Sequence, residues 1–305
     1  MQIATVTKGV AVAGLNGLVG SFKSFVPTNV FHFVKRFAPA HYKQLGMDKL
    51  PISVCIIAGA EAKRIARALE SVRDWCAEII VVLNEEVSDG TDEVASRFNA
   101  KIFREPWKGH IAQKNSAAAK ASQPWILGLD SDEAVSAELR KEIQEAFARG
   151  DIGNFAAFSF PRCTLCCGKW IRHGDWYPDR GVRLWKAGLA SWGGVDPHDK
   201  LEVIGTVKAL RGDLEHHSME SLDAIILKAI RYSDTFIQET RRQNRRISRL
   251  DVFGRPAWRF FRSYLIRLGF LDGRQGYYVA FITAIYTFLR YAKAYEAQQN
   301  DPVPL

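Results

Sequence analysis

The sequence has few cysteines and no long apolar segment, and each shortage excludes a class of protein. Five cysteines in 305 residues are too few and too unevenly spaced for a disulfide scaffold. No apolar run reaches the roughly 18 residues that a bilayer-spanning helix needs. Hydrophobic residues make up 47% of the chain and charged residues 25%, as in folded globular proteins, and the net charge of +9 favours an anionic partner. We therefore expect a folded protein, soluble or bound to a membrane surface, from a reducing compartment.

The chain divides into three segments of different composition, residues 1–50, 51–218 and 219–305. In the first segment, the apolar stretch Gly9–Gly20 matches a signal peptide poorly, because no basic residue precedes Lys8. The following stretch, Phe22–Phe37, combines spaced aromatic and basic residues and is amphipathic. Two interpretations of this extension stay open: it lies on an anionic membrane, or it packs loosely on the domain that follows.

Short apolar runs alternate with helical patterns at the start of the second segment. Runs of this kind are typical of buried parallel strands joined by helices. The pattern predicts an α/β fold, with a mostly parallel, Rossmann-like sheet covered by helices on both faces. In such a sheet, ligands bind at the carboxyl ends of the strands. The predicted strands are Ser53–Ala58, Glu78–Leu83, Lys101–Phe103 and Trp125–Leu129, and the clearest helices are Glu61–Arg73 and Gly109–Ser122.

Acidic residues follow several of these predicted strands. Glu61 comes after the first and Asp89 after the second, and the string LDSDE places Asp130, Asp132 and Glu133 directly after the fourth. Carboxylates gathered at one edge of a sheet repel each other unless a cation neutralises them, and Mg²⁺ or Mn²⁺ prefers such oxygen ligands. The pattern therefore favours a metal–nucleotide site, the alternative being that Asp130 or Asp132 only caps a helix.

Longer motifs in this region resemble those of a known family. From Ile52 to Glu133 the chain is similar to the glycosyltransferase family 2 domain of GT-A fold, and more narrowly to its lipopolysaccharide-core β-glucosyltransferase branch. The resemblance rests on PISVCIIAGAEAKRIARALESV, EIIVVLNEEVSDGT, REPWKGHIAQKNSAAAKASQPWILGLDSDE, RGDLEHHS and LGFLDGRQGYYVAFITAIYTFLRYAKAYE, and it covers about residues 52–296. It implies an inverting transferase that moves a sugar from a nucleotide donor to an acceptor hydroxyl.

The resemblance also implies roles for individual residues in the nucleotide-sugar half, residues 51–133. Glu61 and Asp89 match positions that contact the nucleotide, and Lys114 matches a basic position that faces the nucleotide or its diphosphate. Asp130 would meet the ribose, and Asp132 the metal that bridges the two phosphates. The chain departs from the family pattern at Ala60-Glu61 and Leu83-Asn84, which concern base recognition more than metal binding.

Residues 134–218 are expected to form the acceptor half and to supply a general base. A carboxylate usually takes the proton of the acceptor hydroxyl as the new bond forms. Asp199, in GGVDPHDKLEV, corresponds to the family's His-Glu or His-Asp pair and is the first candidate, and His198 would orient the base or the acceptor. Asp196 and Asp179 are competitors, and any of the three aspartates would alternatively hold a turn beside proline.

The same half is rich in aromatic and basic side chains that suit a sugar acceptor. Aromatic rings stack on the apolar faces of sugars, although short strands also bury them in a core. Arg180 and Arg183 would bind the diphosphate or an acceptor phosphate through paired hydrogen bonds. For His216, a metal or phosphate contact competes with a purely structural role. The aromatic residues are Trp170, Trp176, Tyr177, Trp185 and Trp192, of which Trp176 is the first candidate for an acceptor contact.

Three cysteines in this half raise the hypothesis of a zinc site. Cys163, Cys166 and Cys167 lie close together, with His173 as a conceivable fourth ligand. A structural zinc site usually takes two separated pairs of ligands, and the sequence offers no second pair nearby.

The third segment is basic and amphipathic. Arg241–Gln275 contains ten arginines and no lysine against Asp251 and Asp272, with interleaved aromatic and aliphatic residues, and Tyr277–Leu289 is almost wholly apolar. Arginine with tryptophan and phenylalanine on short helices is typical of a segment at a membrane surface. Nucleic acid and a solvated basic face on packed helices are the two alternatives.

Together these observations predict a metal-dependent inverting glycosyltransferase that acts at the cytoplasmic face of the cell membrane. Its cofactor would be Mg²⁺ or Mn²⁺, its donor a nucleotide-diphosphate sugar with UDP-glucose as the first guess, and its acceptor a glycan or lipid-linked glycan such as lipopolysaccharide core. A nucleotidyltransferase is disfavoured because AGAEAKR, after the first strand, has a single glycine instead of a glycine-rich loop. A non-catalytic adaptor for membrane or nucleic acid is the other alternative.

Overall fold

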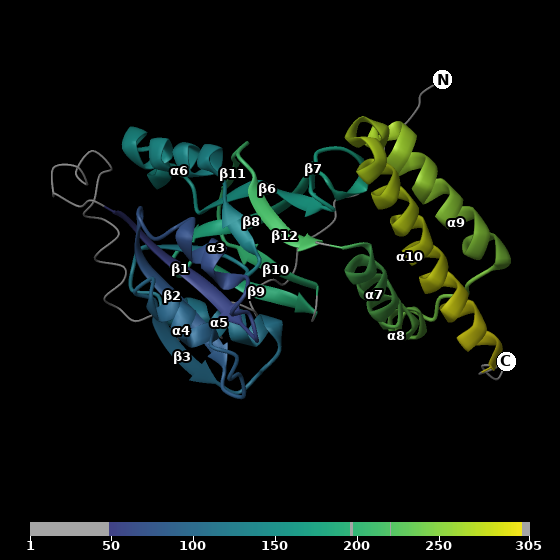
Figure 1. Ribbon diagram of the computed structural model, residues 1–305, viewed down its shortest axis with the longest axis horizontal. Coiled ribbons are helices and arrows are strands. Elements are labelled where there is room, and N and C mark those ends of the chain that lie inside the picture. Colours follow the sequence, from purple (N-terminus) through teal and green to yellow (C-terminus); the bar gives the residue numbers. More distant parts are fainter. Residues whose placement is uncertain (1–48, 196–197, 220, 301–305) are drawn as a thin grey trace, which may run out of the picture. The chain divides into compact units, whose positions relative to one another are not determined.

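The computed structural model describes residues 49–195, 198–219 and 221–300. The expectation for the amphipathic stretch Phe22–Phe37 therefore concerns a part of the chain outside the described residues. Across the described ranges, ten strands form one sheet and two more form a separate hairpin, and helices cover the sheet (Figure 1).

Four parallel strands form the first half of the sheet, in the order β3-β2-β1-β4. They are β1 (Leu50–Ala58), β2 (Cys76–Asn84), β3 (Lys101–Glu105) and β4 (Trp125–Gly128). The apolar runs of β1, β2 and β4 form strands that are buried on both faces, whereas β3 is a largely exposed edge strand. Ile52, Val54 and Ile56 point into one layer of the core, whereas Cys55 belongs to the other. The predicted parallel, Rossmann-like half of the fold is thus confirmed.

Helices cover both faces of this parallel half. Residues of α3 (Ile65–Glu70), α4 (Thr91–Ser96) and α6 (Ala137–Arg149) share one core layer with β1. On the other face, Ala117 of α5 (His110–Ala119) packs near Ile80 and Val82 of β2. The predicted helices on both faces are therefore confirmed.

The second half of the sheet mixes parallel and antiparallel pairs. Strand β4 pairs antiparallel with β8 (Asp179–Lys186), which pairs antiparallel with β6 (Ala157–Cys166). Strand β12 (Leu214–Met219) runs parallel to β6 and antiparallel to β5 (Glu133–Val135). The remaining elements of this half are β7 (Lys169–Ile171) and β11 (Val207–Ala209), both on β6, the hairpin of β9 (Ala190–Val195) with β10 (His198–Val203), and the short helices η1 (Asp151–Asn154) and η2 (Gly174–Trp176).

This arrangement brings several strand ends to one edge, which we call the carboxyl edge. Strands β1, β2 and β4 end there, and β8 begins there because it runs antiparallel to β4. Strand β4 is tightly packed at its end, since a Cβ on Gly128 would lie 2.9 Å from the Trp192 ring and 3.2 Å from Trp185. The residues that follow β4 are thereby held beside the hairpin of β9 and β10.

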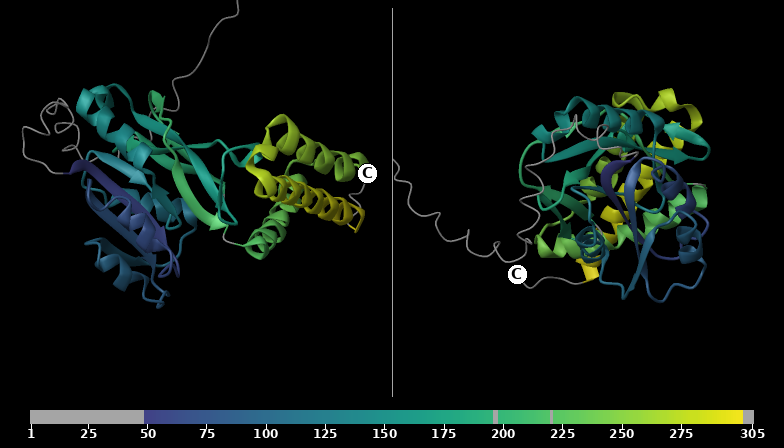
Figure 2. Two further views of the ribbon diagram at one scale, coloured as in Figure 1. Left: turned by 45° about the horizontal axis from the view of Figure 1, so that its top comes forward. Right: turned by 90° about the vertical axis from the view of Figure 1, so that its left-hand side faces the viewer.

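The last described segment is helical. It comprises α7 (Leu222–Ser233), α8 (Thr235–Arg242), α9 (Arg249–Phe261), the π-helical turn η3 (Arg262–Ile266), η4 (Gly269–Asp272) and α10 (Gly273–Asn300). Ser248 begins α9 with a capping box that it forms with Asp251. Helices α9 and α10 lie side by side (Figure 2). Although α10 has 28 residues, neither it nor any other described helix combines the length and apolarity needed to cross a bilayer.

Candidate active site

Three carboxylates predicted to bind the nucleotide or its metal, those of Glu61, Asp89 and Asp132, lie close together at the carboxyl edge. Asp89 accepts backbone hydrogen bonds from Thr91 at 3.1 Å and from Ala62 at 3.0 Å, so it ties the loop after β2 to the loop after β1. The Thr91 hydroxyl and the Ala62 amide lower the pKa of the Asp89 carboxyl. Burial raises the pKa of Glu61, against the opposing charge of its neighbour Arg64, and the nearby charges of Asp132 and Asp89 raise it further. These carboxylates therefore repel one another, as expected for a cation-binding edge.

His216 reaches the position that the sequence assigned to a metal. Its Nε2 lies 3.5 Å from an Asp132 carboxylate oxygen, while its Nδ1 faces the hydroxyls of Thr164 at 3.1 Å and Ser218 at 3.3 Å. The backbone N–H of His217 also donates to the Asp132 carbonyl at 2.8 Å, which fixes the loop after β4 against β12. The tertiary structure thus brings together two residues that the sequence separates widely.

The donor set at Asp132 fits Mg²⁺ or Mn²⁺ in the presence of a diphosphate. Mg²⁺ in proteins usually takes one or two carboxylates and completes its octahedron with phosphate oxygens and water, and an imidazole nitrogen also suits Mn²⁺. Asp132 would supply the carboxylate and His216 the imidazole. Within the described residues, no group of three or more His, Cys, Asp or Glu side chains could hold a metal ion.

Lys114 joins the donor side to the acceptor side. Its ammonium, on α5, lies 2.9 Å from an Asp130 carboxylate oxygen and 2.8 Å from an oxygen of Asp199, on β10. The same ammonium lies 4.6 Å from the centre of the Trp192 ring, and its side chain is only 10% exposed. The predicted ribose contact and the predicted general base therefore share one buried cation.

Two arginines and a buried glutamate continue this network. Arg183 lies 3.2 Å from both Asp130 and Glu133, and Arg162 bridges Glu133 at 3.5 Å to Asp179 at 2.9 Å. Burial alone would raise the pKa of Asp130, but the charges of Arg183 and Lys114 hold it well below its ordinary value. Glu133, which is fully buried, also accepts a bond from the Asp130 backbone at 3.0 Å.

Sequence reasoning counted Glu133 only among the carboxylates that follow the fourth strand, and it gave no role to Arg162. Glu133 stands in the LDSDE string, so its place after β4 was a usable signal. Arg162 carried no such signal, because its partners are distant in the chain. Asp179 meets it when β6 pairs with β8, and Glu133 meets it through β12, which pairs with both β5 and β6.

Half of the predicted site residues line one cavity of about 500 Å³, and Glu61, Asp89, Asp132 and His216 are not among its lining residues. Arg180 donates a hydrogen bond to the Leu210 carbonyl at 2.8 Å at this cavity. The cavity is therefore walled by charges of both signs and by one indole ring, that of Trp192. The predicted residues that line it are Lys114, Asp130, Asp179, Arg180, Arg183 and Asp199.

Other predicted residues lie elsewhere. Trp176, in η2, packs against a cluster that includes Ile225 and Val279 and is not among the residues that line the cavity. Trp185 is buried in the core. His198 is part of β10, but its side chain, like the whole of Asp196, is outside the described residues.

The side chains of Cys163 and Cys166 are buried in the fold. Burial raises the pKa of the thiols of Cys163 and Cys166 to about 12, which opposes the thiolate form that zinc requires. The Cys163 thiol lies 3.4 Å from the Ile171 carbonyl, and His173 Nδ1 is 3.0 Å from Asp272. The sequence hypothesis of a zinc site therefore gains no support from this geometry.

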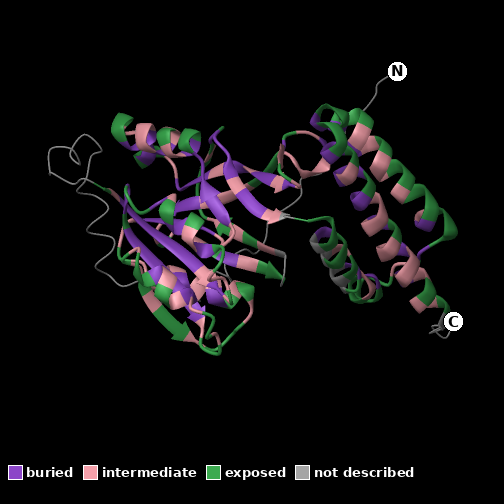
Figure 3. Cartoon of the chain, viewed as in Figure 1, coloured by how far each residue is buried: buried purple, intermediate pink, exposed green. Residues whose placement is uncertain are grey.

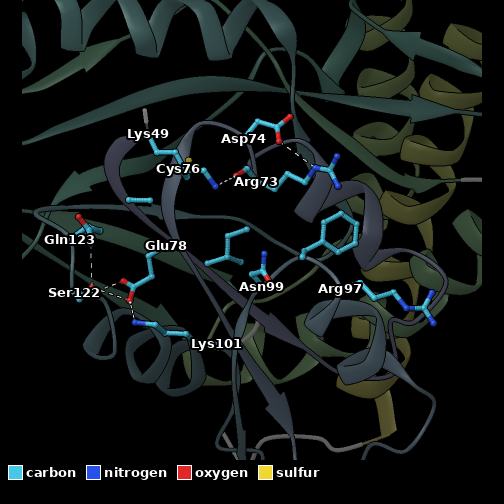
Figure 4. A pocket seen from close by; sticks show the side chains of 13 residues that line it. Lys49, Arg73, Asp74, Cys76, Glu78, Arg97, Asn99, Lys101, Ser122 and Gln123 are labelled. Atoms are coloured by element: carbon cyan, nitrogen blue, oxygen red, sulfur yellow. Dashed lines mark hydrogen bonds and ion pairs between the residues drawn. The ribbon is translucent and has the colours of Figure 1, made fainter. Parts of the chain in front are cut away.

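A second pocket, of about 390 Å³, lies where β1, β2 and β3 begin, and we call it the amino-edge pocket (Figure 4). Its buried carboxylate, Glu78, accepts hydrogen bonds from the Ser122 backbone at 2.8 Å, the Ser122 hydroxyl at 2.9 Å, Lys101 at 2.6 Å and the Ser53 hydroxyl. Burial would raise the pKa of Glu78, but the bonds from Lys101 and Ser53 lower it overall. Glu78 is thus satisfied by its own chain.

Comparison with known proteins gives a consistent result. Residues 53–190 match the family model described as Glycosyl transferase family 2. An uncharacterised glycosyltransferase of Rickettsia typhi is 30% identical over 254 residues, which cover 80% of this chain and 87% of that protein. The lipopolysaccharide core biosynthesis glycosyltransferase LpsC of Rhizobium meliloti is 28% identical over 257 residues, which cover 82% of this chain and 94% of that protein. Among solved structures, S. aureus TarS in complex with UDP-GlcNAc aligns over 81% of this chain and 92% of that chain at 12% identity, with a TM-score of 0.42.

Proposed function

Because the chain belongs to glycosyltransferase family 2, we propose that it transfers a sugar from a nucleotide-diphosphate donor to a hydroxyl of a glycan or lipid-linked glycan, with inversion at the anomeric carbon. One observation carries this proposal. Lys114 lies within 2.9 Å of Asp130 and 2.8 Å of Asp199, so a donor-side and an acceptor-side carboxylate meet at one cavity.

The carboxyl edge would hold the donor. Glu61 and Asp89 would contact the nucleotide, and Asp130 its ribose. Asp132 and His216 would hold Mg²⁺ or Mn²⁺, which neutralises the charge of the departing diphosphate. The convergence of His216 Nε2 on Asp132 at 3.5 Å supports this assignment. UDP-glucose is the first donor to test.

Asp199 would act as the general base. The acceptor oxygen attacks the anomeric carbon, the bond from that carbon to the diphosphate oxygen breaks, and the hydroxyl proton passes to the Asp199 carboxylate. A single displacement of this kind inverts the anomeric configuration. Lys114 pairs with Asp199 in the ligand-free chain, and a bound diphosphate would attract the same ammonium and leave Asp199 free to accept the proton.

The acceptor is proposed to be a glycan of the lipopolysaccharide-core type, at the cytoplasmic face of the membrane. The similarity to LpsC supports this acceptor class. Arg180, which is exposed at the cavity, offers a guanidinium for an anionic substituent.

The test is a donor screen with the purified full chain. Release of nucleoside diphosphate is measured for UDP-glucose and other nucleotide sugars, with Mn²⁺, with Mg²⁺ and with chelator, in the presence of extracted core glycans. We expect release from one donor that depends on both cation and glycan. Release of pyrophosphate from a nucleoside triphosphate and a sugar phosphate would instead indicate a nucleotidyltransferase, and no turnover of any donor would refute the transferase.

A further inference from the structure

The helical hairpin of α9 and α10 exposes large apolar side chains that a water-soluble surface normally buries. Phe253 is 69% exposed and Trp258 55% exposed, although the helix they belong to packs along α10 through buried Val252. Figure 3 shows the outer side of α9 coloured mainly as exposed. We call the following residues the aromatic face: Leu250, Phe253, Trp258, Phe261 and Leu265 from α9 and η3, and Tyr277, Phe281 and Phe288 from α10.

Side-chain contacts make this face continuous across both helices. The rings of Phe253 and Phe288 lie 6.4 Å apart, and Tyr277 stacks on Phe281 with centres 5.8 Å apart. Phe260, which is half-buried, joins the two helices through a ring contact of 5.8 Å with Tyr277. Contiguous exposed apolar surface of this kind marks an interaction site.

Aliphatic side chains extend the aromatic face at one end of the hairpin. Leu265, Ile266, Leu268 and Leu271 are each about half exposed, and all lie in the turn from η3 to η4. Nucleic-acid bases stack on aromatic rings and gain little from leucine or isoleucine, whereas lipid acyl chains bury both kinds of side chain. This end of the hairpin therefore favours lipid over nucleic acid.

The charge around the aromatic face is complementary to an anionic surface. Residues 241–275 contain ten arginines against two aspartates. Asp272 is buried and Asp251 is engaged by Ser248 and Arg255, so neither presents a free carboxylate. Arg274 is exposed and shares a helical stripe with Tyr277 and Phe281 on α10. A second copy of the chain would bring the same arginines against these and be repelled, whereas lipid phosphates would pair with them.

We propose that the aromatic face docks on an anionic lipid bilayer, with its rings and leucines at the level of the headgroups and with exposed arginines such as Arg274 paired with lipid phosphates. The hairpin lies on the surface and does not cross it. This interaction depends on neither the donor nor the catalytic residues, so it stands independently of the proposed transferase activity.

Ion pairs with an aspartate of η2 attach this hairpin to the segment that precedes β8. The Asp175 side chain, only 3% exposed, lies 3.3 Å from Arg259, 3.6 Å from Arg262 and 3.5 Å from Arg267. Asp272 accepts bonds from the backbone of Arg172 at 2.9 Å and of His173 at 2.8 Å. The segment so held continues into β8, whose first residues line the cavity. If the proposed function is right, docking would hold the acceptor side of the enzyme at the membrane surface.

The test is vesicle flotation of the full chain. Vesicles of phosphatidylcholine are compared with vesicles that contain about 30% phosphatidylglycerol. We expect binding to the anionic vesicles, weakened by about 0.5 M NaCl. The double variant Phe253→Ser and Trp258→Ser should reduce the binding constant about tenfold or more. The matched control is Trp107→Ser, which removes a 46% exposed tryptophan outside the hairpin and should bind as the wild type does.

A second pair of variants tests whether positive charge beside the aromatic face contributes to vesicle binding. Arg274→Gln should weaken binding to anionic vesicles a few-fold, whereas Arg97→Gln, at the amino-edge pocket, should not. Circular dichroism and light scattering check that each variant folds and remains in the same oligomeric state. The proposal is overturned if the wild type does not bind anionic vesicles, or if the double variant binds as well as the wild type. It is also overturned if light scattering shows a dimer that the double variant dissociates, or if single-stranded RNA binds and vesicles do not.

Discussion

The glutamates at the two edges of the parallel sheet have different surroundings, and their pKa values shift in opposite directions. At the amino edge, Glu78 accepts hydrogen bonds from two serines and Lys101, and all of these partners belong to the fold. At the carboxyl edge, Glu61 is surrounded partly by other carboxylates, which together with burial raise its pKa. One edge lowers the pKa of its glutamate and the other raises it.

This difference in surroundings distinguishes a carboxylate that stabilises the fold, such as Glu78, from one proposed to serve function, such as Glu61. A carboxylate that its own chain fully satisfies contributes to the stability of the fold. Carboxylates that repel one another weaken the fold, and such arrangements concentrate at functional sites where a ligand supplies the missing cation. Substitutions at the carboxyl edge should therefore change activity more than stability, and substitutions at the amino edge should do the reverse.

The largest effect on activity is expected from Asp199→Asn. An amide of the same size cannot accept the acceptor proton, so kcat should fall by about 10²- to 10⁴-fold. Binding of the nucleoside diphosphate should change little, because Asp199 is assigned to the acceptor. Calorimetry of UDP binding provides this control, and a variant that keeps full turnover would remove Asp199 as the base.

Asp132→Asn should reduce kcat/KM about 10²- to 10³-fold, because it removes a ligand that stabilises the charge of the leaving diphosphate. The melting temperature should stay the same or rise, since one of three mutually repelling carboxylates is lost. Titration of Glu61 by NMR should show its pKa closer to the ordinary value in this variant. A lowered melting temperature would show that Asp132 stabilises the fold, which would contradict the proposed difference between the carboxyl edge and the amino edge.

Lys114→Met should lower both activity and stability. Its loss leaves Asp130 and Asp199 without their shared cation, so donor KM should rise about tenfold and the free energy of unfolding should fall by about 1–3 kcal/mol. Urea denaturation and steady-state kinetics measure the two effects. Lys114→Arg keeps the charge and should recover most of the stability, which distinguishes a loss of charge from a loss of packing.

Glu78→Gln should leave turnover within about twofold and lower the free energy of unfolding by about 1–3 kcal/mol, since an amide cannot accept all of the hydrogen bonds that reach the carboxylate. The pH dependence gives a further check. The pKa of Glu78 is lowered in the folded state, so its contribution is present above the ordinary value of 4.5 and is lost as pH falls below it. The gap in melting temperature between wild type and variant should therefore narrow from pH 7 to about pH 3.

Much of the parallel half could be predicted from sequence, and less of the mixed half. Buried parallel strands such as Leu50–Ala58 are continuous apolar runs bounded by turns, and both signals are local. Strands β6 and β8 pair through distant partners, so their order in the sheet has no local signal. The zinc hypothesis for Cys163 and Cys166 illustrates the same limit, because spacing along the chain did not reveal that the fold buries these thiols.

The amino-acid order is enough to place Asp130 and Asp132 after a buried strand, and hence at the ligand-binding edge, because chain direction fixes which end of a parallel strand is the carboxyl end. The contacts of Lys114 with Asp199 and of His216 with Asp132 depend on how separate elements pack, so they could be known only from the folded chain. Packing also decides which side of α9 is covered. Periodicity shows that residues share a helical face, but only packing determines whether that face is buried or, like Phe253 and Trp258, left exposed.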